Sequence, residues 1–166
     1  MKTLVVGLGN PILTDDGVGV KVAYEIQRLL TTRDMEQITV TEASAGGIRL
    51  MEMMIGYERA IIIDALIGGN DDQPGTMYRM TLDDLRDISP TQHSASAHDT
   101  SLVTALELGK KIGLSLPEVI IIFAVEVENV MDFGEQPTAA VSAAIPQLID
   151  AVLGELNISQ ESVIAN

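Results

Sequence analysis

The chain has 166 residues, nearly half of them apolar, which is enough for one domain with a substantial core. It contains no cysteine, and this excludes a disulfide framework, a thiolate metal site and a cysteine nucleophile. The formal net charge of −14, the few aromatic residues and the lack of an apolar run of bilayer length disfavour nucleic-acid and membrane partners, so we expect a cytoplasmic protein, by default a monomer.

The N-terminal segment reads as a strand followed by a helix. Leu4-Val5-Val6 is a β-branched run that ends at Gly7, which is typical of a buried parallel strand. Apolar residues recur at helical spacing from Val18 to Leu29. Thr14 or Asp15 stands where a cap for the first helical turn is expected.

A second strand and a short helix come next. Residues 38–41 alternate as a strand does, and this strand ends at Glu42. The small residues 43–47 form a loop. Residues 50–54 carry the apolar side chains of a short helix.

The middle of the chain contains the clearest strand, residues 60–63, which is expected to stop at Asp64. Residues 76–80 predict an edge strand. Residues 81–97, rich in Asp, Ser, Pro and Ala, predict an irregular surface loop.

The C-terminal part repeats the helix and strand pattern. A helix is expected to begin around His98 and to end near Gly109. Residues 119–124 predict another buried strand, and residues 138–153 a closing helix with Pro146 inside it as a kink.

Alternating strands and helices predict a three-layer α/β/α sandwich with a mostly parallel twisted sheet of about five strands. Residues 76–80 follow Asp64 too closely for a helical crossover, so this strand is expected to be antiparallel at an edge. We expect a single α/β domain over residues 1–153 and a frayed tail over 154–166.

Four acidic residues are expected at the edge of the sheet where the parallel strands end. Asp16 follows the first strand, Glu42 the second, Asp64 the third and Glu126 the last. Ligands of open α/β sheets bind in the crevice beyond these strand ends. Each acid alone also has a structural interpretation, since Asp16 suits the start of a helix and Asp64 can cap a turn.

The two histidines, His93 and His98, both fall in or beside the long loop, where a lone histidine is usually just solvated. Two carboxylates and one imidazole together would make an oxygen and nitrogen site suited to nickel, zinc or manganese. Without a metal, Asp16 and Asp64 would share a proton, as the pair in acid proteases does. The residues alone leave both chemistries open. No serine lies in a Gly-x-Ser-x-Gly context, which disfavours a serine hydrolase.

Several segments resemble the hydrogenase maturation endopeptidases over roughly residues 1–153. The family's N-terminal signature is similar to Gly-Leu-Gly-Asn-Pro-Ile-Leu-Thr-Asp-Asp-Gly-Val-Gly-Val at residues 7–20. Its second motif resembles Ile62-Ile63-Asp64-Ala65, and its histidine motif resembles Ser96-Ala97-His98. Its following edge strand is similar to residues 74–76, and residues 126–134 also fit.

This resemblance implies an endopeptidase that removes the C-terminal extension of a hydrogenase large-subunit precursor once nickel has been inserted. It implies that Asp16, Asp64 and His98 bind the metal and carry catalysis, and it gives His93 no role. The metal would be the substrate's own nickel, with zinc or cadmium able to replace it in vitro.

The sequence departs from the family at the loop after the second strand. Glu42-Ala43-Ser44-Ala45-Gly46-Gly47 stands where the family commonly shows Asp-Gly-Gly-Thr-x-Gly, so the role of Glu42 and the 43–47 loop stays open.

Three other readings remain. A non-catalytic nickel-binding or partner-binding maturation chaperone could use the same fold. A peptidyl-tRNA hydrolase shares the Gly-Leu-Gly-Asn-Pro opening, but here no histidine precedes His93 and the charge disfavours tRNA. A dinucleotide-binding loop would need glycine at Ile12.

Overall fold

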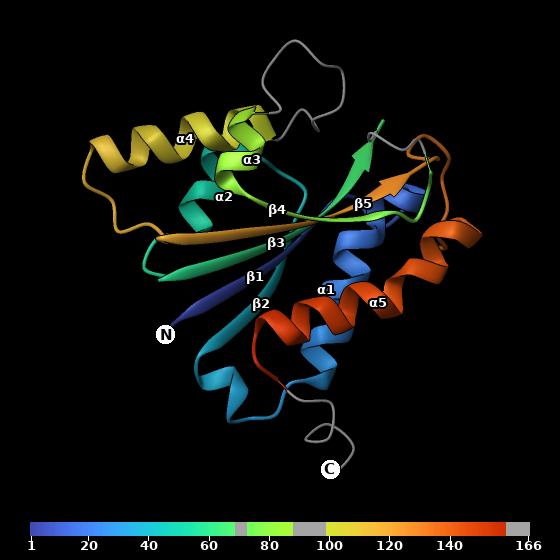
Figure 1. The fold of residues 1–166 in the computed structure, drawn as a ribbon, viewed down its shortest axis with the longest axis horizontal. Coiled ribbons are helices and arrows are strands. Elements are labelled where there is room, and N and C mark those ends of the chain that lie inside the picture. The colour runs from blue at the N-terminus through green and yellow to red at the C-terminus, as the bar shows by residue number, and fades with distance from the viewer. Residues whose placement is uncertain (69–72, 88–98, 159–166) are drawn as a thin grey trace.

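The computed structural model describes residues 1–68, 73–87 and 99–158. A five-stranded sheet in the order β2-β1-β3-β5-β4 is covered by helices on both faces (Figure 1). The predicted three-layer α/β/α architecture is therefore confirmed. No helix among the described residues is long and apolar enough to span a membrane.

The described elements include every strand and helix that the sequence predicts, in the predicted order, together with three short helices that it does not predict. They are β1 (Thr3–Leu8), η1 (Thr14–Gly17), α1 (Val18–Leu29), η2 (Asp34–Glu36), β2 (Ile38–Ala43), α2 (Gly47–Met53), β3 (Arg59–Ile67), β4 (Met77–Thr81), α3 (Leu82–Asp87), α4 (Asp99–Lys111), β5 (Val119–Val127) and α5 (Ala139–Glu155).

Four of the strands run parallel, and the fifth does not. β1 pairs in parallel with both β2 and β3, and β3 pairs in parallel with β5. β4 pairs antiparallel with β5 at the edge of the sheet, as the short connection after β3 predicts.

Successive side chains of the central strands fill two separate cores, because side chains alternate between the faces of a sheet. Ile61 and Ile63 pack with α1 and α5 on one face, whereas Ala60 and Ile62 pack with α2, α3 and α4 on the other. Full burial of one such isoleucine stabilises the fold by about 1.5–3 kcal/mol. The strands β1, β3 and β5 are thus largely apolar on both faces, whereas β2 alternates between apolar and polar residues.

A topological switch lies between β1 and β3. The chain leaves β1 through α1 to reach β2 on one side, and then crosses through α2 to reach β3 on the other side. Open α/β sheets place their ligand crevice at such a switch point, beyond the carboxyl ends of the strands.

Several expected element boundaries are wrong. β3 continues past Asp64 to Ile67, and β5 continues past Ala124 to Val127, because the two strands pair in parallel over their whole length. Residues 82–87, expected to be part of a loop, form α3. The rest of that loop, residues 88–98, lies outside the described residues.

Two helix ends also differ from expectation. α4 passes through Gly109 and ends at Lys111, and Gly113 takes the positive φ of 82° that usually follows a helix. No side chain caps α1, whose N-cap residue is Gly17. The closing helix α5 contains Pro146 and extends to Glu155.

Candidate active site

Asp64 lies where β3 loses one of its two neighbours. The pairing of β3 with β1 ends at Ile63, which faces Gly7, whereas its pairing with β5 continues to Ile67. Asp64 is therefore the first residue of β3 beyond β1, at the rim of the crevice. Its side chain is almost completely buried, and its Oδ1 accepts a hydrogen bond of 2.8 Å from the N–H of Ala65.

The position of Asp64 in the strand decides which face its carboxylate occupies. Ile63 and Ala65, its chain neighbours, both pack in the core under α1 and α5. Alternation therefore directs Asp64 toward the other face, which α2, α3 and α4 cover.

Asp16 lies in η1, the single 3₁₀ turn that precedes α1. Its side chain is half-buried, and its Oδ2 accepts a 2.7 Å hydrogen bond from the N–H of Asn10, which fixes the carboxylate against the first loop. Gly9 allows the first loop to approach the backbone of Asp16 this closely. Its φ is 121°, and a Cβ at this position would lie 1.8 Å from the carbonyl oxygen of Asp16, so no other residue fits.

Gly19 brings the turn with Asp16 to the strand with Asp64. A Cβ on Gly19 would lie 2.3 Å from the carbonyl oxygen of Ile63 and 2.5 Å from that of Leu8, so the first turn of α1 sits directly on the ends of β1 and β3. η1 also contacts β3. The structure thus places Asp16 and Asp64 at the same edge of the sheet, beside the topological switch.

His93 and His98 both lie outside the described residues, as does the Ser96-Ala97-His98 motif. α4 begins at Asp99, directly after His98, and Leu102 and Leu106 of α4 pack on the face toward which Asp64 points. Within residues 1–68, 73–87 and 99–158, no cluster of three potential His, Cys, Asp or Glu ligands occurs.

Asp15 has a structural role that its sequence position does not reveal. It is fully buried, and its carboxylate accepts hydrogen bonds from the N–H groups of Glu128, Asn129 and Thr138 and from the Thr138 hydroxyl, at 2.7–3.3 Å. Asp15 therefore holds the start of α5 and the loop after β5, rather than capping α1 as expected.

The two other acids expected at this edge have partners of their own. Glu126 lies within β5 rather than after it, is buried, and accepts a 2.9 Å hydrogen bond from the Tyr78 hydroxyl. Glu42 lies in β2, two strands from β3, and accepts a hydrogen bond from the Tyr24 hydroxyl. This bond, with the nearby carboxylate charge, raises the pKa of Tyr24 above its ordinary value.

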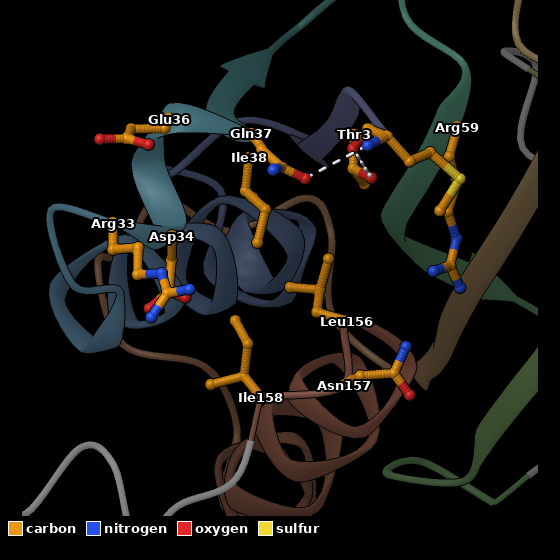
Figure 2. A pocket seen from close by; sticks show the side chains of 11 residues that line it. Thr3, Arg33, Asp34, Glu36, Gln37, Ile38, Arg59, Leu156, Asn157 and Ile158 are labelled. Atoms are coloured by element: carbon orange, nitrogen blue, oxygen red, sulfur yellow. Dashed lines mark hydrogen bonds between the residues drawn. The ribbon is translucent and has the colours of Figure 1, made fainter.

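A cavity of about 430 Å³ lies at the opposite edge of the sheet, far from these carboxylates. Figure 2 shows Ile38, Leu156 and Ile158 pointing toward one another in it, with Arg33 and Arg59 at its margin. Arg59 starts β3 and Ile38 starts β2, so this cavity belongs to the amino ends of the strands, where α/β sheets do not place their active sites.

A second cavity, of about 550 Å³, adjoins the carboxyl end of β2 and is lined by the loop from Ala43 to Ala45 and by Glu42, Arg49, Glu52 and Met53. It belongs to the functional edge but is separated from Asp64 by β1. The loop after β2, whose sequence departs from the family pattern, therefore borders this cavity.

The chemistry available at the edge follows from its two carboxylates. Asp16 comes from a 3₁₀ turn and Asp64 from a strand, and both are fixed by backbone hydrogen bonds. Pre-oriented carboxylates can ligate a cation or activate a water molecule without reorganising. Either use suits hydrolysis.

Comparison with known proteins identifies relatives of this fold. A family model described as hydrogenase maturation protease matches residues 20–155, a range that includes Asp64 and begins after Asp16. The hydrogenase 2 maturation protease of Escherichia coli is 28% identical over 157 residues, covering 94% of this chain and 91% of that protein. The hydrogenase expression/formation protein HupD of Rhizobium leguminosarum is 25% identical over 152 residues, covering 92% and 72%.

Solved structures agree in fold. The structure of the hydrogenase maturating endopeptidase HybD from E. coli superimposes with a TM-score of 0.78 at 24% identity, covering 95% of this chain and 93% of that one. The nickel–iron hydrogenase maturation protease HybD from Thermococcus kodakarensis superimposes with a TM-score of 0.70 at 21% identity, covering 94% and 99%.

Proposed function

Since the chain belongs to the hydrogenase maturation protease family, we propose that it is an endopeptidase that removes the C-terminal extension of a nickel-loaded hydrogenase large-subunit precursor. Membership makes it a hydrolase of peptide bonds. The choice of substrate, the cleavage position and the nickel requirement are the parts that go beyond membership.

One observation carries the proposal. The contact of Gly19 with the ends of β1 and β3 supports it, because this contact holds the turn that carries Asp16 at the same edge of the sheet as Asp64. Burying a carboxylate at a strand rim is costly, and an apolar residue at the same position would pack without that cost. This arrangement is unnecessary for the core, so it favours a role in chemistry.

The donor set fits nickel held by the substrate. Carboxylate oxygens from Asp16 and Asp64, with an imidazole nitrogen from His98, form a borderline set that leaves coordination positions for the substrate's own ligands. Bound there, the metal would supply recognition and polarisation of the scissile carbonyl. In this scheme Asp16 and Asp64 orient the precursor, and a carboxylate of the pair accepts the proton of the attacking water.

The experiment is incubation of purified protein with the large-subunit precursor from the same organism, in nickel-loaded and nickel-free forms, followed by intact-mass spectrometry. We expect one cut near the C-terminus of the loaded form and none in the other. Equal processing of both forms would remove nickel from recognition and favour the metal-free carboxylate pair. Binding without any cut would indicate a maturation chaperone instead of a protease.

A further inference from the structure

Three large apolar side chains are exposed on two loops beside η1. Met131 and Phe133, in the loop between β5 and α5, are 82% and 83% exposed, more than any other large apolar side chain among the described residues. Ile12, in the loop between β1 and η1, is 49% exposed. Side chains of this size on the surface of a folded domain mark interaction sites when they gather on neighbouring segments.

The two loops adjoin along their backbones. The N–H of Gly134 donates to the carbonyl of Ile12 at 2.9 Å, and the N–H of Thr14 donates to the carbonyl of Gly134 at 2.8 Å. Leu13 and Gly134 form a parallel bridge between these bonds. Ile12 and Phe133 therefore belong to one surface, although they lie near opposite ends of the chain.

Side-chain hydrogen bonds from Thr14 and Asn129 fix the backbone of the loop that carries this surface. The Thr14 hydroxyl donates to the carbonyl of Asp132 at 2.6 Å, and the Asn129 side chain accepts from the N–H groups of Met131 and Asp132 at 3.3 and 3.2 Å. Thr14 itself has a φ of 44°, a conformation that a β-branched residue keeps only where its surroundings impose it. A fixed surface loses little conformational entropy when a partner binds.

The charged residues of the two loops that carry this surface are all negative. Glu128, Asp132 and Glu135 are exposed in the second loop, and neither residues 9–17 nor residues 128–138 include a lysine or an arginine. A complementary partner would therefore combine apolar side chains with positive charge. A second copy of this chain would bring the same acids face to face, which makes an isologous dimer unfavourable here.

We propose that Ile12, Met131 and Phe133, the loop patch, dock an apolar segment of the precursor that is flanked by lysine or arginine. This rests on the proposed function, because the precursor is the partner that must approach Asp16. Ile12 lies on the loop that leads to Asp16, and the loop with Met131 and Phe133 is hydrogen-bonded to it, so a segment bound there would lie next to the scissile region. The patch would supply affinity and register, leaving the carboxylates to the chemistry.

The test compares Met131→Ser/Phe133→Ser with Ile112→Ser, a control that removes an apolar side chain with 66% exposure at the opposite edge of the sheet. Affinity for the nickel-loaded precursor is measured by biolayer interferometry in an Asp64→Asn background, which prevents turnover. Cleavage kinetics are measured without that background. We expect the double variant to raise Kd and KM by about tenfold or more with kcat within about twofold, and the control to change neither.

Binding of the wild-type protein to the nickel-loaded precursor should also weaken as the salt concentration is raised, because acids flank the patch and lysine or arginine flanks the docked segment. Unchanged Kd and KM in the double variant would overturn the loop patch while leaving the protease assignment intact. Absence of cleavage by the wild type, together with a patch-dependent Kd, would overturn the proposed function and support the surface. A change in self-association on sedimentation, with precursor affinity unchanged, would assign the patch to a second copy and overturn the proposal.

Discussion

Asp15 and Thr138 are 123 residues apart in the chain and are joined by two hydrogen bonds, from the Thr138 N–H to Oδ1 at 2.7 Å and from its hydroxyl to Oδ2 at 3.1 Å. The next residue, Asp16, instead binds Asn10 and faces the edge of the sheet. The two consecutive acids thus have different partners and different roles. Asp15 anchors the first loop to α5, and Asp16 is the residue to which we assign the proposed chemistry.

Asp15→Asn should therefore destabilise the protein. The amide places an NH₂ group where the carboxylate accepts from backbone N–H groups, so at least one buried donor loses its acceptor. We expect a loss of about 2–3 kcal/mol and a Tm lower by roughly 4–12 °C. Thermal unfolding measures both. A Tm equal to the wild type would show that the loop does not depend on this anchor.

Asp16→Asn and Asp64→Asn should each retain the fold and lose processing by at least about a hundredfold. Both changes keep side-chain shape and remove the charge that a cation or a proton transfer requires. Circular dichroism, thermal unfolding and cleavage of the loaded precursor are the measurements. A variant that cleaves at the wild-type rate removes that residue from the site.

His98→Ala should also abolish processing, whereas His93→Ala should be mild, because only His98 lies in the Ser-Ala-His context that resembles the family motif. The same cleavage assay separates them. The reverse result would transfer the imidazole role to His93.

Gly19→Ala should weaken both stability and processing. The added methyl would meet backbone oxygens of Ile63 and Leu8, which cannot rotate away, and should displace α1 at a loss of about 3 kcal/mol. Gly154→Ala is the matched control, because Gly154 is also a helical glycine and a methyl group added there would have no atom within 4 Å. That change should stabilise by up to about 1 kcal/mol without affecting cleavage.

Stability should fall in acid through Glu155. Its hydrogen bond with Arg79, at 2.9 Å, and the charge of Arg59 hold the pKa of this carboxyl below its ordinary value of 4.5. A lowered folded-state pKa means that the contribution is complete above the ordinary value and disappears as pH falls through the folded value. Glu155→Gln should thus be less stable at pH 7, and the difference should shrink between about pH 5 and 3. Urea unfolding across this range measures it, and a constant difference would contradict it.

The strands β1, β3 and β5 were predictable because they are continuous apolar runs, and β2 because its residues alternate. The antiparallel pairing of β4 was predictable because its connection is short. The ends of β3 and β5 were not predictable. Asp64 interrupts an apolar run and suggests an end, but a strand ends where its partner stops pairing, and β5 continues to pair with β3 up to Ile67.

α3 could have been found from the sequence. Thr81 and Asp84 form a reciprocal capping pair, with the Thr81 N–H donating to Asp84 at 2.6 Å and the Asp84 N–H donating to the Thr81 hydroxyl at 3.3 Å. The Thr-x-x-Asp spacing before Leu85 is the signal. It was outweighed by the polar composition of the surrounding residues.

The position of Asp16 and Asp64 at the carboxyl edge of the sheet was predictable, because Asp16 follows the first loop and Asp64 follows the core of a strand. The role of Asp15 was not. Its partners, Asn129 and Thr138, come from the other end of the chain, and a helix-capping rule considers only the next few residues. The loop patch was also invisible, because exposure of Phe133 depends on how its loop is anchored to Thr14.

The bond between Asp15 and Thr138 also sets an order of events during synthesis. At the usual pace of translation, roughly 6–25 s separate the appearance of these two residues. Until Thr138 has been made, the Asp15 carboxylate cannot accept the hydrogen bonds from this residue, and the first loop is not yet anchored to α5. A nascent or truncated chain that lacks Thr138 therefore holds Asp15 and Asp16 in a first loop without this anchor.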